Sequence, residues 1–429
     1  MRRFLSLFCI LLFAELTHAQ RKPAKLLLPT TPESAGMSSE RLKRIDTMLT
    51  GWVERGRTNG AVALIVRDGK IVYQKAFGCN DAEKKEPIRV DDIYRIASQT
   101  KAITSVAVMM LYEEGKFLLD DPISRYIPEF AHPQVLDKFN AADTTYTTIP
   151  AKTEITIRQL LTHTSGISYA QIGTKEANAI YAKNNITAGL GASKEHVLAT
   201  DIKKLAKLPL IFQPGEKWSY GLNSDVLGYL VEVLSGMSLN EFFRTRIFEP
   251  LGMKDTYFNV PPEKQNRIAN IFAEAGGRLF PAPPVAFVNG MIRTDYPKSG
   301  TTYFSGGAGL SSTALDYAIF LQMLLNGGEY NGKRVLARNT VRLMTMNQIG
   351  DIDFGGNKFG LGFQITTEKG SSILPTPPGV FEWGGYFATT YWADPKEKLI
   401  GILYRQLSGS TQGDAAGKYK VMVYSAIND

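Results

Sequence analysis

Cysteine and histidine are scarce in this chain of 429 residues, which has two cysteines and four histidines. Cys9 lies in an apolar N-terminal stretch that we expect to be removed, which would leave Cys79 without a partner for an intramolecular disulfide. His132, His163 and His196 stand far apart, without the H-E-x-x-H or paired-cysteine spacing of a metal site. The sequence therefore predicts a fold held by its core, with no metal and no cofactor.

Several functional signatures are also absent. No uninterrupted apolar run reaches the ~18 residues needed to cross a bilayer, so we expect no stable membrane span. There is no P-loop, no G-x-G-x-x-G that opens a helix after a strand, and no serine in the G-x-S-x-G elbow of the α/β-hydrolases. The formal net charge of +8 is spread along the chain rather than gathered in a basic run, so nucleic-acid binding is not expected either.

The N-terminus is typical of a secretory signal peptide. Arg2 and Arg3 precede an apolar stretch at 4–14, and small residues ending at Ala19 form a cleavage site. We expect cleavage before Gln20, which makes the mature chain periplasmic or secreted. An uncleaved N-terminal anchor is the alternative, but the stretch is too short to span a bilayer.

Hydrophobic periodicity places strands at both ends of the chain and helices between them. A helix capped at Ser38 or Ser39 is followed by a β-hairpin with its turn at Asp68-Gly69. The predicted strands are 61–66, 71–77, 361–366, 388–393 and 399–406, and a last helix covers 416–427. Between about 100 and 350 the pattern is mainly helical, at 102–114, 157–162, 225–235, 239–247 and 312–325.

This layout predicts the α+β class, with an antiparallel sheet built from both termini, flanking helices and a large, mostly helical inserted region. The sheet region covers about 38–97 and 351–429, and the helical region about 98–350. After a signal peptide at 1–19, residues 20–429 are expected to form a single unit. Two long loops, 168–194 and 275–300, are of a length that often borders a functional site.

Ser98 and Lys101 are candidate catalytic residues. They belong to an S-x-x-K sequence that occurs once in the chain and directly precedes a predicted apolar helix. A serine in the first turn of a helix lies in the positive end of the helix dipole, which stabilises its alkoxide. A lysine three residues later lies on the same face, so its amine can reach the hydroxyl. Taken alone, the pattern also fits a capping serine and a solvated surface lysine.

The surroundings of this pair resemble a known family. The segments Y-R-I-A-S-Q-T-K at 94–101, L-Y-E-E-G-K at 111–116 with L-D-D-P at 119–122, and L-L-T-H-T-S-G at 160–166 resemble the serine β-lactamase-like superfamily. They are most similar to class C β-lactamases and to the esterases and D,D-peptidases of that fold. The resemblance implies a β-lactamase/transpeptidase-like fold, with Ser98 as the acylated nucleophile and Lys101 as its proton partner.

Two further segments match the family in order. Tyr220 stands where the family has the tyrosine of Y-x-N, and the resemblance implies that it is the general base, as a phenolate. An isolated tyrosine would also fit a packing role. Asn223 follows it by three positions instead of two, a departure from the family pattern, and is a candidate substrate-binding residue. Residues 305–312 resemble the family's G-G-x-x-S segment, and we expect Ser311 or Ser312 to cap the next helix.

The third family element, normally K-T-G on a strand, is here Trp383-Gly384-Gly385. These three are candidate substrate-binding residues, and the resemblance implies an oxyanion hole made by the backbone N–H groups of Ser98 and Tyr386. Because Trp383 cannot supply the lysine charge that binds a substrate carboxylate, the resemblance is closest to the esterase branch, the family VIII carboxylesterases. Core packing is the other interpretation of Trp383.

The sequence thus predicts an exported serine hydrolase that cleaves small-molecule carboxylic esters through an acyl-enzyme. The alternative is a D,D-peptidase or weak class C-like β-lactamase that acts on cell-wall amides. A non-catalytic binding protein on this fold is a further alternative, which the intact Ser98, Lys101 and Tyr220 disfavour. No pattern indicates an oligomeric state.

Overall fold

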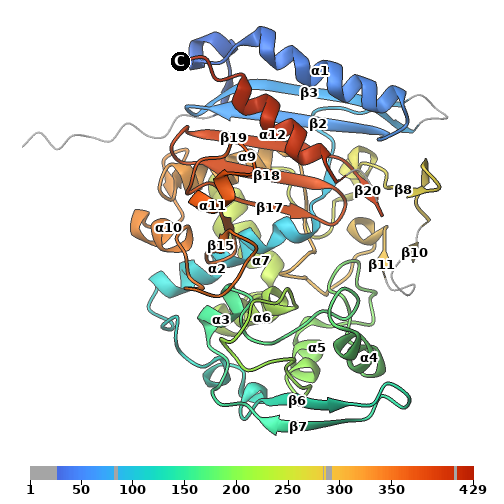
Figure 1. Cartoon of the computed structure of the whole chain (residues 1–429), viewed down its shortest axis with the longest axis vertical. Coiled ribbons are helices and arrows are strands. Elements are labelled where there is room, and N and C mark those ends of the chain that lie inside the picture. The colour runs from blue at the N-terminus through green and yellow to red at the C-terminus, as the bar shows by residue number, and fades with distance from the viewer. Residues whose placement is uncertain (1–26, 82–85, 284, 287–291, 410–412) are drawn as a thin grey trace, which may run out of the picture.

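Segments from both ends of the chain form one large sheet in the computed structural model (Figure 1). The model describes residues 27–81, 86–283, 285–286, 292–409 and 413–429. The predicted signal peptide lies outside the described residues. Within the described part of the chain, no helix is long and apolar enough to cross a membrane.

The strand order of the sheet is β1-β3-β2-β19-β18-β17-β16-β15, with β4 paired to the end of β3. All pairs are antiparallel except β1 with β3. The turn between β2 and β3 is Asp68-Gly69, where both residues have positive φ (49° and 69°), as the predicted tight hairpin requires. The strand bounds are β1 Leu28–Pro29, β2 Gly60–Arg67, β3 Lys70–Asp81, β4 Glu86–Pro87, β15 Lys358–Phe359, β16 Gln364–Ile365, β17 Phe381–Gly385, β18 Thr389–Asp394 and β19 Leu399–Tyr404.

Alternate residues of the central strands pack on opposite faces of this sheet. On one face, Ala61, Ala63 and Ile65 pack with α1 (Ser39–Glu54) and α12 (Ala415–Ser425). Ser38 accepts a hydrogen bond from the backbone of the first turn of α1 and is its N-cap, one of the two predicted positions. On the other face, Val62, Leu64 and Val66 join the main core with α9 (Ala314–Leu325) and α2 (Thr100–Glu113). The sheet is therefore buried on both sides, with α1 and α12 outermost in Figure 1.

The inserted region lies against the second face and extends away from the sheet (Figure 1). Its helices pack around α6, which contacts α2, α3, α5 and α7. The helix bounds are α3 Ile157–Leu161, α4 Lys175–Lys183, α5 Leu198–Leu205, α6 Asn223–Ser235, α7 Leu239–Phe243, α8 Glu249–Leu251 and α10 Arg338–Met344, and a short α11 covers Glu368–Ser371.

Small sheets interrupt the region that was expected to be mainly helical. Two hairpins, β6–β7 and β8–β9, have strands with exposed positions, and a pair of two-residue strands, β5 and β12, joins the segment before α2 to the segment before α9. The bounds are β5 Tyr94–Arg95, β6 Gln134–Phe139, β7 Tyr146–Pro150, β8 Phe272–Ala275, β9 Arg278–Pro281, β10 Val285–Ala286, β11 Ile292–Arg293, β12 Ser311–Ser312, β13 Glu329–Tyr330, β14 Lys333–Arg334 and β20 Leu407–Ser408.

The helix predicted at 239–247 is present, as an α-helix that ends at Phe243 and continues as a wider π turn, Arg244–Phe248. The cap predicted after the 305–312 segment was wrong. The N-cap of α9 is Thr313, whose side chain accepts a hydrogen bond from the Asp316 backbone N–H. Ser311 and Ser312 are not caps because they form β12, which is paired with β5 in the segment that leads to Ser98.

Candidate active site

Ser98 lies in a 3₁₀ turn, Ala97–Gln99, between strand β5 and helix α2. The preceding residue, Ala97, is buried and has a φ of +43°, in the left-handed region that a residue with a Cβ seldom adopts. Strain of this kind is maintained only where the surrounding packing fixes the backbone, and it is concentrated at functional sites. The turn places Ser98 immediately before the N-terminus of α2, as the sequence predicted.

Lys101 is buried on the first turn of α2 and is surrounded by acceptors. Its Nζ donates hydrogen bonds to the carbonyl oxygen of Gly307 (2.8 Å), the hydroxyl of Tyr169 (3.0 Å) and the Oγ of Ser98 (3.3 Å). The same ammonium lies 4.6 Å from the centre of the Tyr220 ring, a cation–π contact. The alternative of a solvated surface lysine does not fit these contacts.

Tyr220 precedes helix α6 and lies in an aromatic cluster beside Lys101. Its ring centre is 5.0 Å from that of His163, 5.2 Å from Tyr169 and 5.6 Å from Trp383. The Trp383 indole Nε1 donates a hydrogen bond to the Tyr220 hydroxyl at 3.3 Å. The strand that carries W-G-G and the segment that carries Tyr220, the predicted base, are far apart in the sequence. They meet at the Tyr220 hydroxyl.

Asn223 is fully buried at the start of α6. Its Nδ2 lies 3.0 Å from the His163 Nδ1, and its Oδ1 accepts a hydrogen bond from the Ser165 hydroxyl at 2.5 Å. Burial, and secondly the charge of Lys101, hold the pKa of His163 well below its usual value, so this ring is neutral. With both ends of its amide engaged, Asn223 supports the ring that packs on Tyr220. Its predicted role in substrate binding stays a prediction.

The W-G-G segment forms the end of β17 and runs against the turn that holds Ser98. A Cβ on Gly385 would lie only 2.3 Å from the Ile96 carbonyl oxygen, so glycine is required for this close approach. Tyr386 follows directly and lines the same pocket as Ser98. The two residues of the predicted oxyanion hole are therefore brought together, although their role there stays a prediction.

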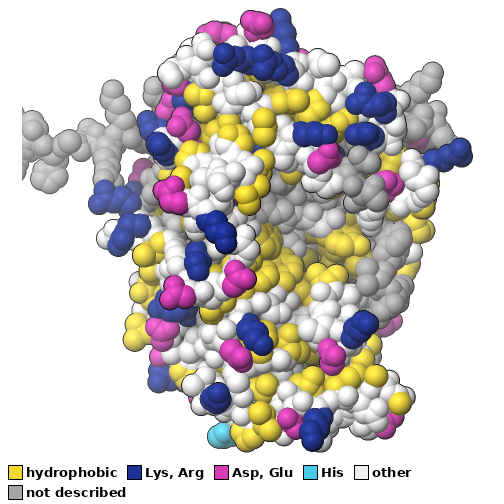
Figure 2. Space-filling model, in the orientation of Figure 1, with side chains coloured by type: hydrophobic (Ala, Val, Ile, Leu, Met, Phe, Trp, Pro, Cys, Tyr) yellow, Lys and Arg dark blue, Asp and Glu magenta, His cyan; other side chains and the backbone are white. Residues whose placement is uncertain are grey.

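The pocket above Ser98 is small and uncharged, with a cavity volume of about 50 Å³. Tyr169, Tyr220 and Tyr386 line it beside Ser98, Gln171 contributes an amide, and the other residues of its wall are apolar, namely Ile172, Ala188, Leu190, Ile292 and Ala308. Among the described residues, no Lys, Arg, Asp or Glu lines this pocket. Figure 2 shows hydrophobic side chains gathered in the hollow across the middle of the molecule.

Asp225 places a carboxyl group beneath this site. It is buried on α6, and its Oδ1 accepts a hydrogen bond from the Ser305 hydroxyl at 2.6 Å. Burial raises the pKa of Asp225, while the hydrogen bond from Ser305 and the charge of Lys101 act in the opposite direction. Gly307 is held between Asp225 and Lys101, because a Cβ there would lie 2.5 Å from the carboxylate. The glycine-rich segment 305–312 is thus part of the lysine's surroundings.

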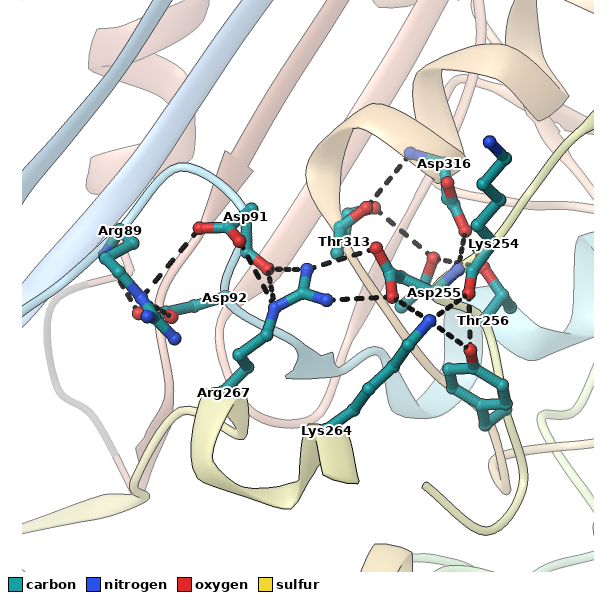
Figure 3. A network of polar contacts seen from close by, with 12 residues as sticks. Arg89, Asp91, Asp92, Lys254, Asp255, Thr256, Lys264, Arg267, Thr313 and Asp316 are labelled. Carbon is teal, nitrogen blue, oxygen red and sulfur yellow. Dashed lines mark hydrogen bonds and ion pairs between the residues drawn. The ribbon is translucent and has the colours of Figure 1, made fainter. Parts of the chain in front are cut away.

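A second polar network holds the segment that leads to Ser98 (Figure 3). Arg267 forms ion pairs with Asp91 (3.2 Å), just before β5, and with Asp255 (2.9 Å). The Asp316 carboxylate on α9 accepts hydrogen bonds from the Asp255 backbone N–H (2.7 Å) and the Thr256 hydroxyl (2.9 Å). Burial raises the pKa of Asp316 to about 6. The network ties β5, β12 and α9 together behind Ser98.

Tyr169 is the site residue that sequence reasoning missed. It follows the L-L-T-H-T-S-G segment, and a single tyrosine in a predicted loop carries no spacing signal. The structure places its hydroxyl on Lys101 and its ring on Tyr220. Within the described part of the chain, no group of three or more His, Cys, Asp or Glu side chains could hold a metal ion.

The sequence of this chain is similar to those of known proteins. The model of a family described as β-lactamase matches residues 45–424. Protein Rv1367c of Mycobacterium tuberculosis is 33% identical, over 85% of this chain and 89% of the relative. Esterase EstB of Burkholderia gladioli is 27% identical, over 90% of this chain and 94% of the relative.

The chain is also similar to a solved structure. It is that of EstCE1, described as a hydrolase with promiscuous acyltransferase activity, and it superposes with a TM-score of 0.75 at 25% identity, over 91% of this chain and 98% of that chain. The predicted fold class is therefore confirmed.

Proposed function

Because the chain belongs to the β-lactamase family and is a serine hydrolase with an esterase among its relatives, we propose that it cleaves carboxylic esters through an acyl-enzyme on Ser98. Lys101 and Tyr220 are the proton-transfer partners. An acyl-enzyme divides one difficult hydrolysis into two easier steps. The backbone N–H groups of Ser98 and Tyr386 bind the oxyanion of each tetrahedral intermediate.

In the first step, the Ser98 Oγ bonds to the carbonyl carbon of the ester, and its proton passes to the Lys101–Tyr220 pair. The bond from that carbon to the alkoxide oxygen then breaks, and the alkoxide takes the proton and leaves as the alcohol. In the second step, the oxygen of a water bonds to the acyl carbon and a water proton passes to the Lys101–Tyr220 pair. The bond from that carbon to the Ser98 Oγ then breaks, the Oγ takes the proton, and the carboxylic acid leaves. Serine, lysine and tyrosine end the cycle as they began it.

The observation that carries this proposal is the uncharged pocket above a Ser98–Lys101 pair. A β-lactam or a peptide C-terminus brings a carboxylate, which would need a cationic partner, and the strand position that would provide one holds Trp383. A neutral ester needs no such partner. The small, mostly apolar pocket favours a short acyl group.

A paired assay of the purified protein tests the proposal. We expect turnover of p-nitrophenyl acetate and little or no turnover of a chromogenic cephalosporin, with both abolished in Ser98→Ala. Clear cephalosporin turnover without ester turnover would favour the alternative, a D,D-peptidase or weak β-lactamase. A protein that binds both compounds and turns over neither would be the non-catalytic binding protein.

The proposal includes export of the protein. The N-terminal sequence supports this, with its two arginines, apolar stretch and small residues at the cleavage site. N-terminal sequencing of the protein from a bacterial periplasm or medium is expected to begin at Gln20. An intact N-terminus in a membrane fraction would indicate an uncleaved anchor instead.

A further inference from the structure

The hydrogen bonds of Lys101 raise a question about the first proton transfer. A lysine ammonium has three N–H donors and no acceptor. Here the three donors are matched by three acceptors, the Gly307 carbonyl, the Tyr169 hydroxyl and the Ser98 Oγ. An ammonium in this arrangement has no lone pair with which to accept the Ser98 proton. Lys101 can therefore take the Ser98 proton only as it gives one of its own protons to a neighbour.

Tyr169 is the neighbour that can take this proton. Gly307 offers a carbonyl oxygen, which is a poor base, and Ser98 is itself the proton donor. The Tyr169 hydroxyl accepts from Lys101 at 3.0 Å, and it lines the pocket beside Ser98. Burial raises the pKa of Tyr169, and the neighbouring Tyr220 and Asp225 raise it further, so Tyr169 keeps its own proton in the resting enzyme.

Tyr220 has no direct hydrogen bond to the nucleophile. Among the described residues, its hydroxyl receives a hydrogen bond from Trp383, and none reaches it from Ser98 or Lys101. Lys101 contacts the face of the Tyr220 ring instead. The ring of Tyr169 lies 5.2 Å from that of Tyr220, and after burial the charge of Tyr220 is the largest cause that raises the pKa of Tyr169. Tyr169 therefore contacts both groups, the lysine through its hydroxyl and Tyr220 through its ring.

From this arrangement we infer that Tyr169 is a third proton-transfer residue, whose hydroxyl connects Lys101 to Tyr220. This inference rests on the proposed function. As Ser98 Oγ bonds to the ester carbon, its proton moves to Lys101, a Lys101 proton moves to Tyr169, and the Tyr169 proton moves to the Tyr220 phenolate. The three transfers are concerted, so Lys101 remains an ammonium and Tyr169 a neutral phenol. Tyr220 then gives its proton to the departing alkoxide.

The direct test is Tyr169→Phe, which keeps the ring and removes the hydroxyl. General acid–base groups contribute about 10²–10⁴-fold to rate, so we expect kcat/KM for p-nitrophenyl acetate to fall about 100-fold. The matched control is Tyr181→Phe. Its hydroxyl is also buried in this region, where it accepts a hydrogen bond from the Ser168 backbone N–H and does not contact Lys101. We expect less than a threefold change for this variant.

Two further readouts separate proton transfer from mere support of Lys101. In mixtures of H₂O and D₂O, the wild-type rate is expected to fall along a curve, because several protons move together, whereas the Tyr169→Phe rate should fall along a line. In addition, the double variant Tyr169→Phe/Tyr220→Phe should be no slower than Tyr220→Phe alone, because residues of one relay act as a unit. Multiplicative losses in the double variant would overturn the inference.

Labelling of Ser98 by a fluorophosphonate keeps this test independent of the substrate. Fluoride leaves without a proton, but Ser98 must still lose one, so Tyr169→Phe should slow the labelling rate by a similar factor. An unchanged labelling rate, with wild-type labelling at Ser98 intact, would overturn the role of Tyr169 alone. Wild-type protein that labels at Ser98 and turns over no ester would instead count against the proposed function.

Discussion

The indole N–H of Trp383 donates a hydrogen bond to the hydroxyl of Tyr220 at 3.3 Å. The two residues are 163 positions apart, and they bring the end of β17 onto the predicted base. Where the family resemblance implies a lysine, this chain thus has an uncharged donor that faces a phenolic oxygen. The contact connects the two features on which the esterase proposal depends, the base and the missing cation.

Trp383→Phe is expected to lower kcat between about 10- and 100-fold with little change in KM, because a hydrogen bond to the proposed Tyr220 phenolate would contribute about 1.5–3 kcal/mol. Steady-state kinetics with p-nitrophenyl acetate measures this. Trp218→Phe is the control. The Trp218 ring stacks beside Tyr220, but its buried indole N–H has no hydrogen-bond partner among the described residues. A higher KM with unchanged kcat in Trp383→Phe would mean that the indole contacts the substrate instead.

Gly385→Ala is expected to reduce kcat at least 100-fold while the protein stays folded. The new methyl would lie 2.3 Å from the Ile96 carbonyl oxygen, so β17 must move away from the Ser98 turn, which would open the proposed oxyanion hole. Gly384→Ala is the matched comparison, because its methyl would meet nothing closer than 3.2 Å, and a much smaller loss is expected. Equal losses in the two variants would contradict this account of the strand.

Asn223→Ala tests whether this residue supports Tyr220 or binds substrate. Its removal leaves the buried His163 Nδ1 without its partner and the Ser165 hydroxyl without an acceptor for its proton, so the free energy of unfolding should fall by about 2 kcal/mol. Urea unfolding measures that loss. In kinetics, kcat should fall and KM should stay, whereas Gln171→Ala, on the pocket wall, should raise KM. A raised KM in Asn223→Ala would restore the prediction of substrate binding.

Asp316 should make the protein less stable as the pH rises from about 4 to 6. Its pKa is about 6 in the folded chain against 3.8 ordinarily, so the folded state holds a proton that the unfolded state has lost over this range. The free energy of unfolding of Asp316→Asn, relative to that of wild type, should therefore rise by up to about 3 kcal/mol between pH 4 and pH 7. Urea unfolding of both proteins at the two pH values measures this difference. A difference that does not change with pH would contradict the assignment.

Local patterns were sufficient to predict most of the sheet. Asp68-Gly69 specified a hairpin turn, and the continuous apolar run that begins at Leu399 placed β19 within two residues of its observed end. The hairpins of the inserted region were missed because β6 and β7 are largely exposed and their strands lack a regular apolar alternation. Such strands are held by contacts that no short window of sequence contains.

The site residues also fall into two groups, those that local spacing predicts and those that only tertiary packing brings together. Ser98 and Lys101 could be paired because the helical repeat fixes residues three apart on one face. Tyr169, by contrast, reaches Lys101 from a segment 68 residues away, and only the packing of α2 against α6 and its neighbours brings them together. The role of Asn223 was also beyond sequence reasoning, since its partner His163 lies 60 residues earlier in the chain.

Mass spectrometry of the trapped intermediate tests the central claim most directly. The wild-type protein is mixed with a slowly hydrolysed short-chain ester, quenched in acid and digested. The account predicts an added acyl group on the peptide that contains Ser98, and its absence in Ser98→Ala. Turnover of the ester with the acyl group on another residue, or with full activity in Ser98→Ala, would contradict it.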